Sequence, residues 1–140
     1  MINNQYKQAS VDTADRGKII IMIYDHCLKW CRIAIDAMEK NEIEKRTTAI
    51  FKVQDGITEL HCSLDFEKGG EIAKNLDRLY EFYNKHLTDA NIKNEVQNVK
   101  DILKMMSGLR EAWVIAVDNV RKNNDVNMRI NKRSYVSMVG

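Results

Sequence analysis

The stretch at residues 64–91, LDFEKGGEIAKNLDRLYEFYNKHLTDAN, decides the fold of this 140-residue chain. Its double glycine, Gly69 and Gly70, predicts a turn, and apolar side chains that recur every three or four positions predict a helix from about Glu71 to Ala90. The residues that share one face of this helix are Ile72, Leu76, Leu79, Tyr83 and Leu87, with Tyr80 and Phe82 on its two flanks. A long helix with one apolar face buries that face against other helices. The stretch therefore predicts a helical bundle.

Three further segments have the same helical spacing, at about residues 13–39, 41–64 and 93–122. Asp12 and Asn41 are suitable capping residues at the starts of the first two, and Asn91 suits a short connection before the last. The predicted core stripes are Ile20, Ile23, Cys27, Cys31, Ala34 and Met38 in the first, Ile50, Val53, Ile57, Leu60 and Leu64 in the second, and Val99, Ile102, Leu103, Met106, Leu109, Trp113, Val117 and Val120 in the last. Gly108 suggests a close helix approach. The predicted fold is all-α: an antiparallel, up-down four-helix bundle.

The length of the chain is that of one ordinary domain, and the absence of proline allows long helices. Residues 1–12 contain too few apolar side chains for a core helix and are predicted to form an N-terminal arm. Residues 13–122 form the predicted bundle, and residues 123–140 a short C-terminal tail. From Arg121 onward the chain has five basic residues and one acidic residue, so we expect a solvated basic tail, with an added strand or a docked peptide as alternatives.

The composition excludes several classes of function. The 22 basic and 20 acidic residues nearly cancel, so there is no general electrostatic case for nucleic-acid binding. No segment approaches the roughly 18 uninterrupted apolar residues of a membrane span, and the N-terminus lacks the pattern of a signal peptide. We therefore expect a cytoplasmic protein without stable membrane insertion. Cys27, Cys31 and Cys62 lie in helical patterns and are expected to be reduced thiols.

Motifs for catalysis are absent from the sequence. It contains no glycine-rich phosphate loop, no G-x-S-x-G and no H-E-x-x-H, and none of the three histidines follows a carboxylate at the i−3 position of di-iron bundles. We expect no enzyme activity, no cofactor and no metal. One alternative is a metal-binding bundle in which Cys27 and Cys31 face His61 and Cys62. Core packing of the two cysteines is favoured, because thiols on a core stripe behave as small hydrophobes.

The first helix has more apolar surface than one bundle face requires. A second series, offset from the core stripe, consists of Ile19, Met22, Trp30, Ile33 and Ala37, with His26 in its gap. An exposed apolar patch of this kind marks a partner site or an aggregation risk. Two interpretations stay open: other parts of the same chain cover the patch, or it is a groove for a helix or extended segment of another protein. A structural homodimer through this face is a further hypothesis.

Several segments, in order along the chain, resemble the flagellin-specific export chaperones of the FliS family. The segments are Tyr6, IMIYDH at residues 21–26, SLDFEKGGEIAKNLDRLYEF at residues 63–82, LTDAN at residues 87–91 and LREAW at residues 109–113. The likeness extends from Tyr6 to about Trp113. The tail beyond Asn123 has no matching pattern.

The resemblance implies a small cytoplasmic helical bundle that holds the C-terminal segment of newly made flagellin. Binding would block premature polymerisation and keep the subunit ready for a flagellar export gate protein. The positions that match the family's pattern are Tyr6, Tyr24, Asn75, Leu79, Tyr80 and Trp113. Together with Ile19, Met22, Trp30 and Ile33 of the first helix, and with Phe82 as a groove edge beside Tyr80, they form the predicted partner-binding set.

The matching positions differ in their expected roles. Leu79 and Trp113 are equally suited to core packing and to partner contact, and Asn75 to a hydrogen bond in helix packing or capping. Tyr24 and Tyr80 are predicted as flank residues able to pack and to bind. A possible homodimer of the unbound protein is also retained.

Overall fold

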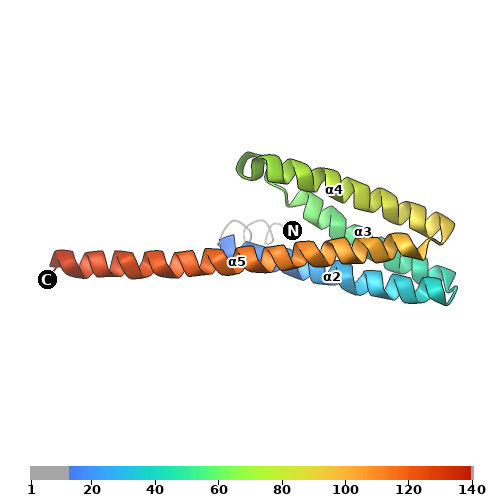
Figure 1. Cartoon of the computed structure of the whole chain (residues 1–140), viewed down its shortest axis with the longest axis horizontal. Coiled ribbons are helices and arrows are strands. Elements are labelled where there is room, and N and C mark those ends of the chain that lie inside the picture. The colour runs from blue at the N-terminus through green and yellow to red at the C-terminus, as the bar shows by residue number, and fades with distance from the viewer. Residues whose placement is uncertain (1–12, 140) are drawn as a thin grey trace, which may run out of the picture. The chain divides into compact units, whose positions relative to one another are not determined.

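The structure, a computed structural model, describes residues 13–139, which form four α-helices and no strand. The helices are α2 (Thr13–Glu39), α3 (Ile43–Cys62), α4 (Phe66–Lys93) and α5 (Val96–Val139). The chain reverses direction at each of the three connections (Figure 1), so consecutive helices are antiparallel. The predicted all-α, up-down four-helix bundle is confirmed. No helix among the described residues combines the length and the apolarity that crossing a bilayer requires.

The chain divides into two compact units. The first, Met22–Arg110, contains segments of all four helices and is called the bundle unit below. The second combines the described parts of the two chain ends, residues 13–21 and 111–139. Its packing includes Gly17 of α2, which faces Val117 of α5 so closely that the glycine position has no room for a side chain.

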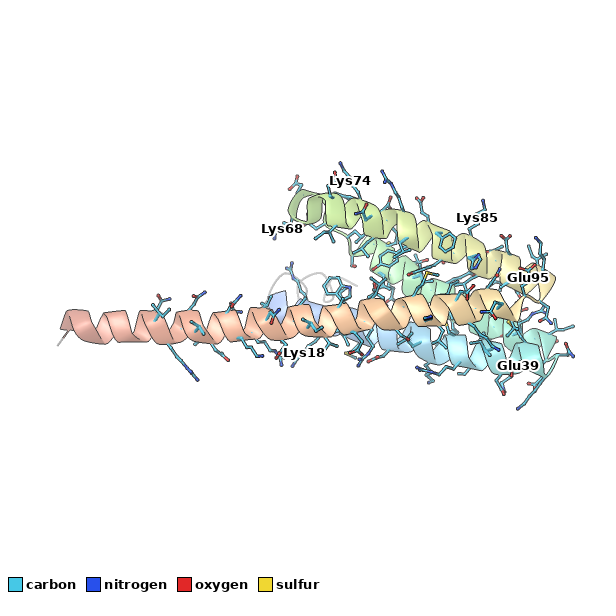
Figure 2. All side chains as sticks on the ribbon, in the orientation of Figure 1. Lys18, Glu39, Lys68, Lys74, Lys85 and Glu95 are labelled. Carbon is cyan, nitrogen blue, oxygen red and sulfur yellow. The ribbon has the colours of Figure 1, made fainter. Side chains whose placement is uncertain are left out.

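The core of the bundle unit is built from all four helices. Its buried side chains include Cys27, Cys31, Ala34 and Met38 of α2, Ile50, Val53, Ile57 and Leu60 of α3, Tyr80, Tyr83 and Leu87 of α4, and Val99, Ile102 and Met106 of α5. These residues confirm most of the predicted stripes. Lys74 and Lys85 of α4 point away from α3 (Figure 2), as expected for the polar face of an amphipathic helix. Ile72 is a correction: it was predicted in the core but is 72% exposed.

Helices α2 and α3 pack closely at Gly56. A Cβ atom at this position would overlap Cys27 Sγ and would lie 3.1 Å from His26 Cδ2. The close approach was predicted at Gly108 instead, and that prediction is wrong, because no atom of another helix lies within 4 Å of the position of a Cβ there. A glycine inside a helical pattern does not by itself indicate which side of the helix a neighbour occupies.

The turn before α4 differs from the prediction in its details. Asp65 is the N-cap, and its carboxylate accepts hydrogen bonds from the backbone N–H groups of Glu67 (3.1 Å) and Lys68 (3.0 Å). The helix therefore begins at Phe66, before the glycine pair, and not at Glu71. Gly70, at φ 50° and ψ −125°, interrupts it in a conformation that strongly favours glycine.

The asparagines at the helix ends have different roles from those predicted. Asn41 does not cap the start of α3: it adopts φ 55° after the end of α2, and Glu42 is the N-cap. Asn91 does not end α4, because the left-handed C-cap is Asn94. The side chain of Asn91 accepts hydrogen bonds from Arg46 Nε (3.0 Å) and Thr47 Oγ1 (3.2 Å), which connect the start of α3 to the end of α4.

The last helix is longer than predicted. We expected it to end near Lys122, where the apolar pattern fails, but α5 continues to Val139. No glycine or proline occurs between Leu109 and Val139, so nothing in the sequence breaks the helix. Residues 121–131 are all exposed, which explains why the apolar pattern stops while the helix does not.

Candidate functional site

The predicted partner face of α2 is only partly buried within the bundle unit. Met22 is 68% exposed, Trp30 and Ile33 are half-buried, and His26 between them is exposed. At about 100° per residue, these four side chains fall within an arc of about 80° on one side of the helix. Ile19, on the same series, is exposed as well but belongs to the second unit.

Trp30 and Ile33 line an open groove between α2 and the start of α3. The groove has a volume of about 660 Å³ and is also lined by Arg32, Asp36, Glu44, Lys45 and Thr48. Its apolar floor thus has a rim with charges of both signs. This combination suits the apolar side chains of an amphipathic segment, with polar groups at the edge.

The indole of Trp30 is held by its neighbours on α2. The Lys29 ammonium lies 5.6 Å from the centre of the Trp30 ring, a cation–π contact, and the His26 ring lies 6.4 Å away at a tilt of 56°. His26 Nε2 donates in turn to the Lys52 carbonyl of α3 at 3.0 Å. The indole in the groove is therefore linked through His26 to both α2 and α3.

Tyr24 and Tyr80, both predicted on the flanks, lie in the core. Their hydroxyl groups share a hydrogen bond of 2.6 Å between α2 and α4, and both residues are fully buried. Burial raises the pKa of Tyr80 to about 12, although the hydrogen bond from Tyr24 acts in the opposite direction. Burial also raises the pKa of Tyr83. This position gives the tyrosine pair a packing role, and their part in partner binding stays a prediction.

The other predicted residues are dispersed. Asn75 is exposed on α4, and Leu79 is half-buried. Phe82 is exposed and stacks on His86 with 5.0 Å between ring centres. Trp113 is half-buried in the second unit, and Tyr6 lies outside the described residues. The structure thus brings Trp30 and Ile33 together in one groove and Tyr24 and Tyr80 together in one core pair.

The two cysteines of the alternative metal site are core residues. Cys27 Sγ donates to the Val53 carbonyl at 3.7 Å, and burial raises the pKa of both Cys27 and Cys31 to about 12. Cys62 is exposed. Among the residues that the structure describes, these cysteines do not gather with His61 as potential metal ligands, so the alternative metal site is not formed, whereas the favoured core packing of Cys27 and Cys31 is confirmed.

Comparison with known proteins then shows the family. The family described as Flagellar protein FliS matches residues 1–120. The chain belongs to the FliS family. The FliS match ends just before the exposed segment of α5 at residues 121–131.

Relatives within the FliS family cover most of the chain. A protein of Bacillus subtilis (strain 168) named Flagellar secretion chaperone FliS is 31% identical over 118 residues, which cover 84% of this chain and 87% of the relative. The proteins of the same name from Campylobacter jejuni and Vibrio cholerae are 36% and 34% identical. They align with 79% and 77% of this chain and with 86% and 82% of their own lengths. The resemblance found in the sequence is confirmed at the level of the family.

The residues of this FliS-family chain that the sequence reasoning missed are of two kinds. The polar rim of the groove, Glu44, Lys45 and Thr48, has no sequence signature, because it depends on how α2 packs against α3. The second kind includes exposed apolar side chains outside the predicted set, such as Ile43, Phe51, Phe66 and Ile115. Of these, Phe51 could have been found, since it lies off the apolar stripe of its helix.

Proposed function

We propose that this protein is a cytoplasmic export chaperone that binds the C-terminal segment of flagellin. In this proposal the bound segment is kept from polymerising prematurely and is delivered to the flagellar export apparatus. Membership of the FliS family supports the chaperone class, and the relatives are named flagellar secretion chaperones. The proposal contains no catalytic step.

The observation that carries the binding step is the groove between α2 and α3. Its floor of Trp30 and Ile33 offers apolar contact area, and Met22 extends the same face of α2. An indole anchor in a groove is the kind of contact that dominates binding energy at interfaces. The charged rim can pair with polar residues of either sign and so fix the orientation of the segment.

The client segment would order as it binds. A disordered segment loses conformational entropy when it docks, and burial of its apolar face offsets this loss. While the face is buried against the chaperone it is unavailable for contact with other flagellin subunits. Release at the export gate would restore the disordered state.

Calorimetric titration of the full chain with a flagellin C-terminal peptide tests the proposal. We expect one peptide per chain and a gain of helical circular dichroism on mixing. Trp30→Ala should weaken binding about tenfold or more, because truncation of a central anchor costs over 1 kcal/mol. Ile92→Ala is the matched control, since Ile92 is 76% exposed and lies outside the groove, and its affinity should match that of the wild type.

Failure of the wild-type protein to bind the peptide would refute the proposal. If the Trp30→Ala and Ile92→Ala variants bound the peptide with equal affinity, the groove would not be the binding site. Sedimentation of the free protein is measured alongside, because a homodimer through Met22 and Trp30 would have to dissociate before the peptide binds. Delivery is tested separately, by capture of the chaperone–peptide complex on the cytoplasmic domain of the export gate.

A further inference from the structure

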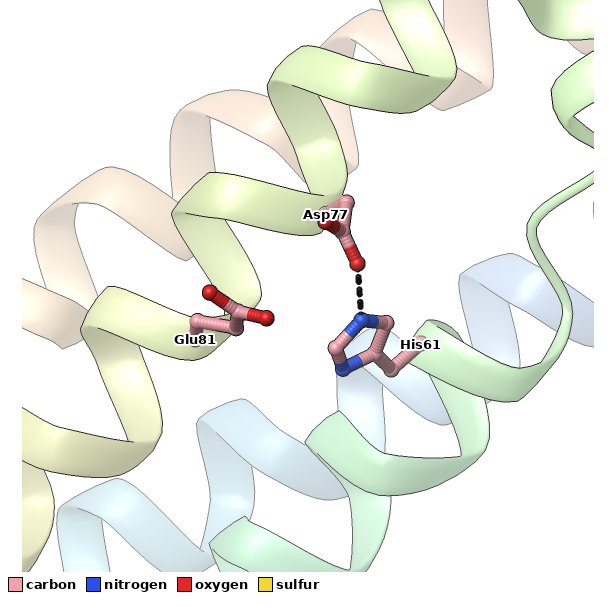
Figure 3. A group of neighbouring side chains, drawn as sticks. All are labelled: His61, Asp77 and Glu81. Carbon is pink, nitrogen blue, oxygen red and sulfur yellow. Dashed lines mark hydrogen bonds and ion pairs between the residues drawn. The ribbon is translucent and has the colours of Figure 1, made fainter.

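Three side chains that can bind a metal ion meet between α3 and α4, away from the groove. His61 comes from α3, and Asp77 and Glu81 come from α4 (Figure 3). Each offers one ligand atom, and these atoms all lie within 4.8 Å of one another. Asp77 and Glu81 are one helical turn apart, so both carboxylates occupy the same face of α4.

The cluster brings two carboxylates together with a single histidine. His61 Nε2 is paired with Asp77 Oδ1. In the described part of the chain, the Glu81 carboxylate has neither a hydrogen bond nor an ion pair, although it lies beside the Asp77 carboxylate. A divalent cation would neutralise both acids and would bind the imidazole nitrogen as a third ligand.

The three ligand atoms are near enough to one another to share one ion. Zinc binds nitrogen and oxygen ligands at about 2.0–2.2 Å, which places two ligands of a tetrahedral site about 3.4 Å apart. The ligand atoms of this cluster lie within 4.8 Å of one another, and side-chain rotation can bring them to that spacing. The side chains of His61 and Asp77 are both 31% exposed and Glu81 is exposed, so an ion can reach all three ligands from solvent.

The surroundings restrict the position of the histidine. The His61 ring lies 6.2 Å from the ring of Tyr80, and Tyr80 is fixed in the core by its hydrogen bond to Tyr24. Preorganised ligands lose less freedom when a metal binds. His61 was considered as a metal ligand from the sequence, but with cysteines as its partners; the structure supplies carboxylates instead.

We propose that His61, Asp77 and Glu81 form a binding site for a divalent transition-metal ion of the zinc class. A mixed set of imidazole and carboxylate ligands suits zinc, cobalt or nickel better than magnesium or calcium, which prefer oxygen ligands alone. Three protein ligands leave one position for water. The ion connects the last turn of α3 to α4 across the connection at residues 63–65. This site does not depend on the proposed client binding.

Titration of the metal-free full chain with zinc chloride, followed by calorimetry, tests the site. We expect one ion per chain. Glu81→Gln should lower the affinity at least tenfold without affecting the fold, because Glu81 has no other partner to lose. His61→Asn should abolish binding of the ion. Zinc should raise the melting temperature of the wild type and leave that of Glu81→Gln unchanged.

Two matched variants separate this site from other zinc ligands. Cys62→Ser removes the exposed thiol next to His61, and His86→Gln removes a histidine of α4 outside the cluster; both should bind zinc as the wild type does. The proposal is overturned if the wild type binds no stoichiometric zinc, if Glu81→Gln binds it with unchanged affinity, or if Cys62→Ser abolishes binding. Should His61→Asn fail to fold, Glu81→Gln decides the result.

Discussion

Replacement of Gly56 by alanine tests how closely α2 and α3 pack. A methyl group at this position would overlap Cys27 Sγ, and it would stand 3.1 Å from His26 Cδ2 and 3.8 Å from Ile23 Cγ2. Cys27 is completely buried, so its sulfur has little free space to move into. Gly108 of α5 provides the matched control, since it is also helical and no atom of another helix lies within 4 Å of the corresponding methyl position.

The two substitutions differ in one energy term. Both gain about 1 kcal/mol of helix propensity when alanine replaces glycine inside a helix. Only Gly56→Ala adds the cost of overpacking, about 1–3 kcal/mol in a well-packed core. Gly108→Ala should therefore raise the free energy of unfolding by about 1 kcal/mol. The free energy of unfolding of Gly56→Ala should be about 1–3 kcal/mol lower than that of Gly108→Ala.

Urea denaturation followed by circular dichroism measures both variants. The double variant Gly56→Ala/Cys27→Ala adds a direct check of the contact, because removal of the sulfur makes room for the new methyl group. We expect a favourable coupling of about 1 kcal/mol between the two changes. If Gly56→Ala were as stable as Gly108→Ala, the close packing of α2 on α3 would be refuted.

Three further predictions concern the cysteines and the buried tyrosine pair. Cys62 should react with a chromogenic disulfide reagent in the folded protein, whereas Cys27 and Cys31 should react only after unfolding, because burial raises the pKa of both thiols to about 12. The free energy of unfolding should also fall as the pH rises above about 9. The reason is that Cys27 and Cys31 ionise in the unfolded chain at a pH where the folded chain still holds their protons. Urea titrations that show constant stability at increasing pH would contradict this. Tyr24→Phe should cost about 1–3 kcal/mol of stability, because it leaves the Tyr80 hydroxyl buried without its partner. Tyr24→Phe/Tyr80→Phe should then cost less than the sum of the two single variants in the same denaturation assay, and additive costs would argue against the hydrogen bond.

Helical periodicity was sufficient to find most of the core. Cys31 and Ile57 could be placed correctly because every third or fourth residue of their helices is apolar. Tyr24 and Tyr80 could not, since a tyrosine hydroxyl suggests a half-exposed flank. The two hydroxyl groups share a hydrogen bond across 56 residues of sequence, and local periodicity contains no information about such a pair.

Helix ends were less predictable for a different reason. Asparagine favours both the N-cap and the left-handed residue after a helix, so Asn41 fitted either role. In the candidate sites too, some residues can be found from the sequence of one helix and others only from the packing of two helices. Trp30 and Ile33 could be found from surplus apolar surface on one helix, whereas Glu81 became a candidate ligand only when α4 was seen to pack beside His61.

The exposed segment of α5 affects how the fold opens. Val99, Ile102 and Met106 are buried in the bundle core. The helical turns that contain them therefore open mainly when the core opens, and it is mainly then that their amide hydrogens exchange with water. At residues 121–131 all side chains are exposed, and the helix is held there chiefly by its own backbone hydrogen bonds, which are marginal in water. Helix α5 is therefore one continuous helix, but its local opening costs much less free energy at the exposed turns than in the core. The exposed turns can unwind and re-form while the bundle remains folded.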